Sequence, residues 1–410
     1  MTDPTSQRTL ANGIPFAHIH TPGRRVEYLA ICIGAGSRDE SRLQHGLAHF
    51  VEHTIFKGTS CRSSLNILST MEELGGELNA YTTKEETMIY TVAPEGNLAV
   101  SAGLLADLLA DATFPDEELN KERQVIADEI DSYRDMPSEV IFDDFEDMLF
   151  KGSSLGHPIL GTRRSIEKFD CRWCMRWVRT FFRPERMAVV YMGPKSAAEA
   201  FLIINETIGG YCQWGQALPP VSVVPPVNPR FEATRRADCH QSHILLGMRA
   251  PSRSDSDRYA WTLMSNMLGG PGMNSLLNVA LREKRGLVYS VEASYSAMTD
   301  CGLFTIYFGC DHKDTDTCLD IVADVIDRMA AKPVSQAMLE KAKNQFSGQL
   351  TVGTDSPLDV ALGAARSLLR KGWVMTLEER IAPLLKVSAE ELSASAGKIR
   401  KEHLSMLILR

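Results

Sequence analysis

The chain has 410 residues, of which 44% are hydrophobic and 23% charged, a composition typical of a globular protein with two or more domains. Its 44 Lys and Arg residues against 52 Asp and Glu residues give a formal net charge of −8, which excludes the uniform basic field that non-specific nucleic-acid binding requires. No stretch approaches the roughly 18 consecutive apolar residues of a membrane span, and the N-terminus resembles no targeting signal. We therefore expect a cytoplasmic protein with neither a nucleic-acid nor a membrane partner.

The expected secondary structure mixes strands and helices throughout. Asn12 and Gly13 predict a tight turn between two short strands. Apolar alternation predicts strands at 26–33, 86–93 and 187–192, and apolar residues at helical spacing predict helices at 41–57, 64–75, 97–112, 116–134, 137–150 and 168–182. Because few helices separate some neighbouring strands, a mostly antiparallel sheet with helices on one face fits better than a doubly wound parallel sheet. We expect an α+β fold.

An internal repeat divides the chain. Residues 29–50 are similar to 244–264, and residues 87–109 are similar to 304–326, at a steady offset of about 215 residues. A proline-rich segment lies between the two copies and predicts an extended tether. We expect two homologous domains, at 1–215 and 234–410, joined by a linker at 216–233.

The cysteines point to no disulfide framework. Their number, nine, is odd and they are scattered, which is typical of reduced thiols. Cys171 and Cys174 form one C-x-x-C, but no second pair completes a zinc ribbon and the pair lies in a predicted helix rather than after a strand. We expect these two thiols to pack in the protein.

The predicted helix 41–57 carries His49, Glu52 and His53 in the order H-x-x-E-H. Histidines four residues apart share one face of a helix, so both rings can reach one metal ion, and this order is the inverted form of the zincin motif. From the His and acidic content, about 0.03 such motifs are expected by chance in the chain. The alternative is a pair of core or surface histidines beside a helix-supporting carboxylate.

A catalytic zinc site needs a third protein ligand. The best supplier is the predicted helix 116–134, where Glu122 and Glu129 lie two turns apart on one face. One would bind the metal, and the other would hydrogen-bond a ligand or the attacking water. His45 continues the histidine row, but on a helix it would be about 12 Å from His53, too far to share an ion.

Several segments together resemble a known family. The signature stretch is HGLAHFVEHTIFKGT, and further matches are TLANGIPFAHIHT, GGELNAYTTKEETMIY, SLGHPILGT and LREKRGLVYSVEASY. They are similar to the inverzincin zinc peptidases that include pitrilysin, insulin-degrading enzyme and the mitochondrial processing peptidase. A chain of two domains resembles the half-size bacterial branch of this family.

The resemblance implies a zinc endopeptidase that cleaves peptides or unfolded protein segments inside a closed chamber. It assigns one Zn²⁺ per chain to His49, His53 and Glu129, the role of general base to Glu52 and an auxiliary role to Glu122. The second half has DRYAWTLMSNM where the motif would repeat, so only the first half would hold metal.

The resemblance also implies substrate contacts. Asn79 and Ala80 match the place where relatives hold the peptide backbone against an edge strand, and their other interpretation is a plain strand-end turn. Arg282 and Tyr289 match an arginine and tyrosine pair that faces the substrate; without the resemblance they are a helix-end charge and a buried aromatic ring. Half-size relatives form a clam-shaped dimer, so we expect a homodimer, with a heterodimer as the alternative.

Two other functions remain open. The chain could be a catalytically silent or structural subunit of a processing-peptidase-like complex, although such relatives usually lose metal ligands. It could also be a metal-dependent hydrolase of small molecules, but binding at an edge strand favours extended peptides.

Overall fold

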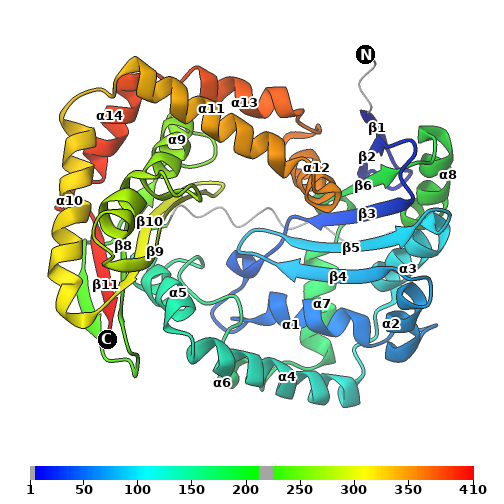
Figure 1. Cartoon of the computed structure of the whole chain (residues 1–410). Helices are drawn as coiled ribbons and strands as arrows, with labels where there is room; N and C mark the ends of the chain where they lie inside the picture. Colours follow the sequence, from blue (N-terminus) through cyan, green and yellow to red (C-terminus); the bar gives the residue numbers. More distant parts are fainter. Residues whose placement is uncertain (1–4, 212–224) are drawn as a thin grey trace. The chain divides into compact units, whose positions relative to one another are not determined.

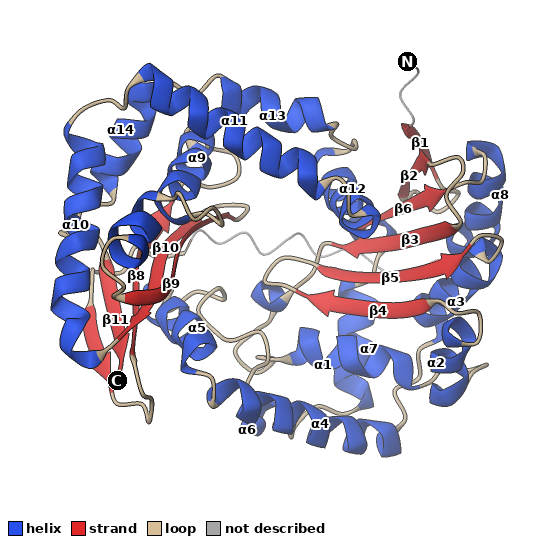
Figure 2. Cartoon of the chain, in the orientation of Figure 1, coloured by secondary structure: helices blue, strands red, loops and turns tan. Residues whose placement is uncertain are grey.

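The computed structural model describes residues 5–211 and 225–410, drawn in Figures 1 and 2. Contacts group the chain into two compact units. Unit 1 comprises Met1–Asp131, His157–Val221 and Gly353–Thr376, and unit 2 comprises Ser132–Gly156, Ser222–Val352 and Leu377–Arg410. Positions 216–224 of the expected linker lie outside the described residues.

Unit 1 is built on a six-stranded sheet in the order β1-β2-β6-β3-β5-β4. Only β2 and β6 pair in parallel; the other neighbours are antiparallel. The strands are β1 (Thr5–Thr9), β2 (Pro15–His20), β3 (Val26–Ile33), β4 (Glu77–Thr82), β5 (Thr87–Pro94) and β6 (Met187–Gly193). The first helices in the chain are α1 (Leu47–Thr54), α2 (Ser64–Glu72), α3 (Leu98–Asp111), α4 (Asp116–Arg134), α5 (Pro137–Leu149), α6 (Arg163–Ile166), α7 (Cys171–Phe181) and α8 (Ala197–Thr207).

Unit 2 has a five-stranded sheet in the order β7-β11-β8-β10-β9. Its strands are β7 (Glu232–Arg235), β8 (Ser242–Ala250), β9 (Val288–Ala297), β10 (Gly302–Cys310) and β11 (Ser405–Leu409). The remaining helices in the chain are α9 (Arg258–Gly269), α10 (Thr315–Ala331), α11 (Gln336–Gly353), α12 (Pro357–Lys371), α13 (Leu377–Leu385) and α14 (Ala389–Lys398).

The two sheets repeat one topology. From β2 to β4 the first sheet has the same sequence of parallel and antiparallel pairings as the second sheet from β7 to β9. Helices follow the corresponding strands in the same order, so α5 in the first half of the chain is the counterpart of α12 in the second. The expected α+β fold and its tandem repeat are confirmed.

Each of these two counterpart helices packs in the unit formed mainly by the other half of the chain. On the first sheet, Leu29, Ile31 and Ile33 of β3 face the core beneath α1, α3 and α7, while Ala30 and Cys32 face α12. The small residues Ala361 and Ala365 of α12 meet this face, which lets helix and sheet approach closely. The expectation of helices on one face therefore needs a correction: α12 covers part of the second face.

Helix α5 has the equivalent place in unit 2. Its Ile141, Phe145 and Leu149 are buried against Leu245 of β8 and Leu407 of β11. The other face of that sheet packs against α9, α10 and α14. Each unit thus has three layers, and one outer helix of each comes from the other half of the sequence.

Most expected elements match the structure within a few residues, and α4 coincides with the predicted 116–134. Cys171 and Cys174 lie on α7 as expected, and Cys174 is fully buried in the core of unit 1. Among the described helices, none combines the length and the apolar character that crossing a membrane requires.

Candidate metal centre

Helix α1 begins at Leu47, later than the predicted 41–57. Gly46 ends the preceding turn with a φ of +92°, in the left-handed region that favours glycine. The carboxylate of Glu40 then accepts hydrogen bonds from the N–H groups of Gly46, at 2.9 Å, and Ala48, at 2.7 Å. Glu40 therefore acts as the N-terminal cap of α1 from outside the helix.

His45 lies before this helix rather than on it. Its ring stacks on that of His157, with 3.8 Å between ring centroids and 2° between ring planes. His157 also bonds Glu40 through Nε2 at 2.7 Å. The loop that contains His157 is thereby joined to the start of α1.

The apolar side of α1 sets the direction of its polar side. Leu47, Phe50 and Val51 are fully buried in the core of unit 1. His49 and His53 consequently lie along the opposite flank, with their ring centroids 4.5 Å apart.

Helix α4 brings both predicted glutamates to these histidines. Glu129 Oε2 lies 3.8 Å from His49 Nε2 and 3.6 Å from His53 Nε2. Glu122 Oε1 instead accepts a hydrogen bond from His53 Nδ1 at 2.9 Å, and its Oε2 pairs with Lys57 Nζ at 2.7 Å. The structure thus gives the two glutamates different partners, a distinction that spacing alone left open.

His49, His53 and Glu129 fit a zinc ion. A tetrahedral site with bonds of about 2.1 Å separates its ligand atoms by about 3.4 Å, close to the observed 3.6 and 3.8 Å. Glu129 Oε2 is buried and has no hydrogen-bond partner among the described residues, so an oxygen aimed at two imidazole nitrogens is left for a cation. No other group of His, Cys, Asp and Glu in the described part of the chain has a geometry that could hold a metal.

The groups of the site differ in their protonation tendencies. Burial lowers the pKa of His49 to about 3, with a further contribution from His53, so the imidazole of His49 is neutral and can donate a lone pair. Burial opposes protonation of His53, but its hydrogen bond to Glu122 and the nearby carboxylates outweigh burial and raise its pKa. Burial also opposes ionisation of Glu122, yet the bonds from His53 and Lys57 hold the pKa of its carboxyl below the ordinary value.

Glu52 lies next to the three candidate ligands. Burial raises its pKa, against the lowering effects of the Thr82 hydroxyl and of His53. Its Oε2 is buried without a hydrogen-bond partner within the described ranges. A carboxylate with a raised pKa and an oxygen free of protein bonds suits a general base.

Strand β4 contacts α1 and forms one edge of the first sheet, as Figure 1 shows. Asn79 and Ala80 lie in its middle, paired with Tyr90 and Ile89 of β5. The other edge of β4 pairs with no described strand. Both residues therefore lie on a strand that can accept an additional strand, and their substrate contact stays a prediction.

Arg282 and Tyr289 lie together in unit 2. Arg282 is in a π-helix at Asn278–Glu283, and its guanidinium carbon is 5.8 Å from the centre of the Tyr289 ring. Tyr289 is 83% exposed on the edge strand β9, so the alternative of a buried aromatic does not apply.

Comparison with known proteins identifies the family. Residues 16–163 match the profile described as "Insulinase (Peptidase family M16)", and residues 175–346 match "Peptidase M16 inactive domain". The chain belongs to the M16 peptidase family. The candidate metal centre lies within the first of these M16 matches.

Individual M16 relatives agree over the full length. The uncharacterized zinc protease YmxG of Bacillus subtilis is 28% identical over 98% of this chain and 97% of its own. An uncharacterized zinc protease of Mycobacterium leprae is 29% identical over 98% of this chain and 90% of its own. The crystal structure of a protease from Helicobacter pylori has the same fold, with a TM-score of 0.92 at 20% identity over 99% of both chains.

Three supporting residues of this M16 chain were missed from the sequence: Glu40, Lys57 and His157. Glu40 and His157 are far apart in the chain and meet only in the fold. Lys57 lies one turn beyond His53, so helical spacing could have suggested its contact with the same partner.

Proposed function

We propose that this chain is a zinc-dependent endopeptidase that cleaves peptides or unfolded protein segments. The observation that carries the proposal is the convergence of two imidazole nitrogens and one carboxylate oxygen beside the buried carboxylate of Glu52. Relatives that are named zinc proteases, and that are similar to this chain over nearly its whole length, support the proposal.

His49, His53 and Glu129 would hold one Zn²⁺. Zinc, when bound, lowers the pKa of a water molecule toward 7 and polarises the scissile carbonyl. Glu122 would accept a hydrogen bond from Nδ1–H of His53, so that the Nε2 lone pair of a singly protonated ring is directed toward the metal position. Lys57 balances the charge of Glu122.

Glu52 would take the proton from the attacking water and pass it to the leaving amine. Its position one residue before His53 keeps it beside the metal ligands. Its unbonded Oε2 supports this role, since no described protein donor competes for that oxygen.

The substrate would extend β4 as an added strand. Backbone groups of β4 around Asn79 and Ala80 would hydrogen-bond the peptide main chain. Binding of this kind depends on an extended peptide conformation more than on the peptide sequence. Arg282 and Tyr289 are proposed contacts from the second domain, and a homodimer, or a heterodimer with a related chain, is proposed to complete the closed chamber.

The decisive experiment is digestion of an unstructured peptide with and without a chelator. Glu52→Gln should keep one zinc per chain and bind the peptide but lose cleavage by about a thousandfold or more. His49→Ala should lose the zinc itself, whereas the matched control His45→Ala should keep it.

The alternative is a catalytically silent subunit. Zinc binding without cleavage by the wild-type chain, at any protein concentration, would favour that alternative. Cleavage at the wild-type rate by Glu52→Gln would contradict the proposed mechanism.

A further inference from the structure

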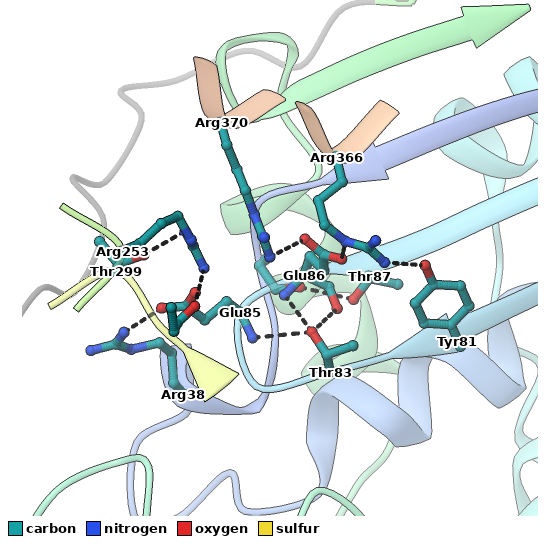
Figure 3. A network of polar contacts seen from close by, with 12 residues as sticks. Arg38, Tyr81, Thr83, Glu85, Glu86, Thr87, Arg253, Thr299, Arg366 and Arg370 are labelled. Atoms are coloured by element: carbon teal, nitrogen blue, oxygen red, sulfur yellow. Dashed lines mark hydrogen bonds and ion pairs between the residues drawn. The ribbon is translucent and has the colours of Figure 1, made fainter. Parts of the chain in front are cut away.

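Glu86 is a buried carboxylate that the proposed mechanism does not use. It directly precedes β5 and is 2% exposed. Arg366 Nε pairs with its Oε1, and Arg370 Nη2 pairs with its Oε2 at 2.7 Å (Figure 3). Both arginines belong to α12, so each oxygen of one buried carboxylate is bonded by the helix that comes from the second half of the chain.

Arg366 also reaches strand β4. Its Nη2 donates to the hydroxyl of Tyr81 at 2.8 Å, as Figure 3 shows. One guanidinium therefore links the β4–β5 hairpin at two points, through Glu86 beside the turn and Tyr81 on the edge strand. Its planar fork can hold both groups at fixed angles, which a lysine ammonium cannot.

The two faces of β4 have different neighbours at this position. Side chains alternate along a strand, so Tyr81 faces α12 while Thr82 faces α1. Helix α1 carries Glu52, and its contact with β4 is direct. The edge strand is thus held by α12 through Tyr81, one residue before Thr82, which lies on the face toward α1.

The turn between β4 and β5 adds a second connection. The carbonyl of Thr83 accepts from the Ser37 N–H at 3.1 Å, and that of Lys84 from the Arg38 N–H at 2.9 Å. Lys84 Nζ donates to the carbonyl of His157 at 2.6 Å. The β4–β5 hairpin, which α12 contacts, is therefore also hydrogen-bonded to the loop before α1 and to the loop that contains His157.

We infer that Arg366, through Tyr81 and Glu86, positions β4 for binding an extended peptide. This inference rests on the proposed function, because it assigns α12 to the peptide-binding part of the same site. An added strand needs the N–H and C=O groups of the edge at fixed spacing, so a loosened β4 binds peptide less tightly while the metal centre is unaffected.

The test uses the full chain loaded with zinc. Arg366→Met should raise KM for an unstructured peptide about tenfold, because β4 and its turn lose the bonds to Tyr81 and Glu86, with kcat within about twofold and zinc content unchanged. Arg366→Lys should restore part of the loss, since it keeps the charge beside Glu86. The control Arg328→Met removes an exposed ion pair with Asp324 on α10 and should leave KM unchanged.

Tyr81→Phe tests the same link without disturbing the buried charge. It removes one hydroxyl and should raise KM by a few-fold, so the inference is testable even if Arg366→Met does not fold. The inference would be overturned if KM were unchanged both in Tyr81→Phe and in a folded Arg366→Met. It would also be overturned if either variant lowered kcat and left KM unchanged.

Amide hydrogen exchange separates this inference from the proposed function. Without any peptide, Arg366→Met should speed exchange at 77–82 and leave the amides of α1 unchanged. If the wild-type chain neither binds nor cleaves peptide, the proposed function fails. Equal exchange at 77–82 in variant and wild type overturns the positioning role by itself.

Discussion

His53 uses its two ring nitrogens for different partners. Nδ1 bonds Glu122 at 2.9 Å and Nε2 faces Glu129 at 3.6 Å. The bond to Glu122 takes up Nδ1–H and leaves Nε2 facing Glu129, and outer hydrogen bonds of this kind hold an imidazole ring in a fixed orientation.

Replacing Glu122 should therefore weaken the metal site without destroying it. In Glu122→Gln the amide oxygen can still accept from His53, but the negative charge is lost and Lys57 has no counter-charge. We expect zinc affinity to fall about 10- to 100-fold, as measured by competition with a chelator. Glu117→Gln, at an exposed position of the same helix, should leave affinity unchanged; an equal loss there would show a general effect on α4.

Glu40 should make stability depend on pH. Burial raises its pKa well above the ordinary value, against the lowering effect of the Ala48 and Gly46 N–H groups. The folded chain therefore holds this proton more tightly than the unfolded chain. The resulting stabilisation is present below the unfolded pKa and is lost as the pH rises through the folded pKa.

Glu40→Gln removes the titration and leaves a side chain that cannot accept from both N–H groups. We expect a loss of about 1–3 kcal/mol in the free energy of unfolding. The difference from wild type should be larger near pH 4.5 than near pH 7.5, because the stabilisation by the bound proton is lost as the pH rises. Urea unfolding with a chelator present measures it, with the exposed Glu402→Gln as control. A difference that grows with pH would contradict the assignment.

The sequence predicted the residues of the centre but not their supports. His49, Glu52 and His53 stand within five residues, and helical spacing alone places them together. The links from His157 to Glu40 and from Arg366 to Glu86 join residues far apart in the chain, and no local pattern encodes them. Such contacts depend on the final packing of the elements.

At the scale of elements, the start of α1 is the least predictable boundary near the site. The apolar spacing extends back to residue 41, but a left-handed glycine and a distant carboxylate begin the helix at Leu47. By contrast, Pro115 and an acidic first turn mark the start of α4, which matches its predicted bounds. Local signals fix a boundary only where the cap is itself local.

Gly46 should be indispensable for this start. A Cβ there would lie 2.7 Å from the carbonyl oxygen of Leu160 and 2.9 Å from the Cα of Gly161, and the φ of +92° would add strain. We expect Gly46→Ala to lose about 2–4 kcal/mol in the free energy of unfolding by urea titration. Gly13→Ala is the matched control, since Gly13 has a φ of +90° with no atom within 4 Å of the added Cβ, and it should lose only about 1 kcal/mol. Equal losses would mean that backbone strain alone decides the effect.

At the scale of the whole molecule, the repeat was predictable but the exchange of helices was not. Strands and helices recur at a constant offset, so the sequence alone indicates two copies of one fold. The apolar stripes of α5 and α12 show that each helix buries a face, but an amphipathic pattern does not say against which sheet. Only the three-dimensional structure assigns α12 to the first sheet and α5 to the second.

The exchange of α12 has a consequence for synthesis on the ribosome. All six strands of the first sheet have been synthesised once the chain reaches residue 193. One face of that sheet, which includes Ala30 and Val190, is covered by α12, and α12 follows only at Pro357–Lys371. At about 5–20 residues per second, this face waits on the order of ten seconds or more for its cover. We expect the nascent chain to expose an apolar sheet surface, and a buried carboxylate without its arginines, throughout that interval, which makes it a natural client for chaperones.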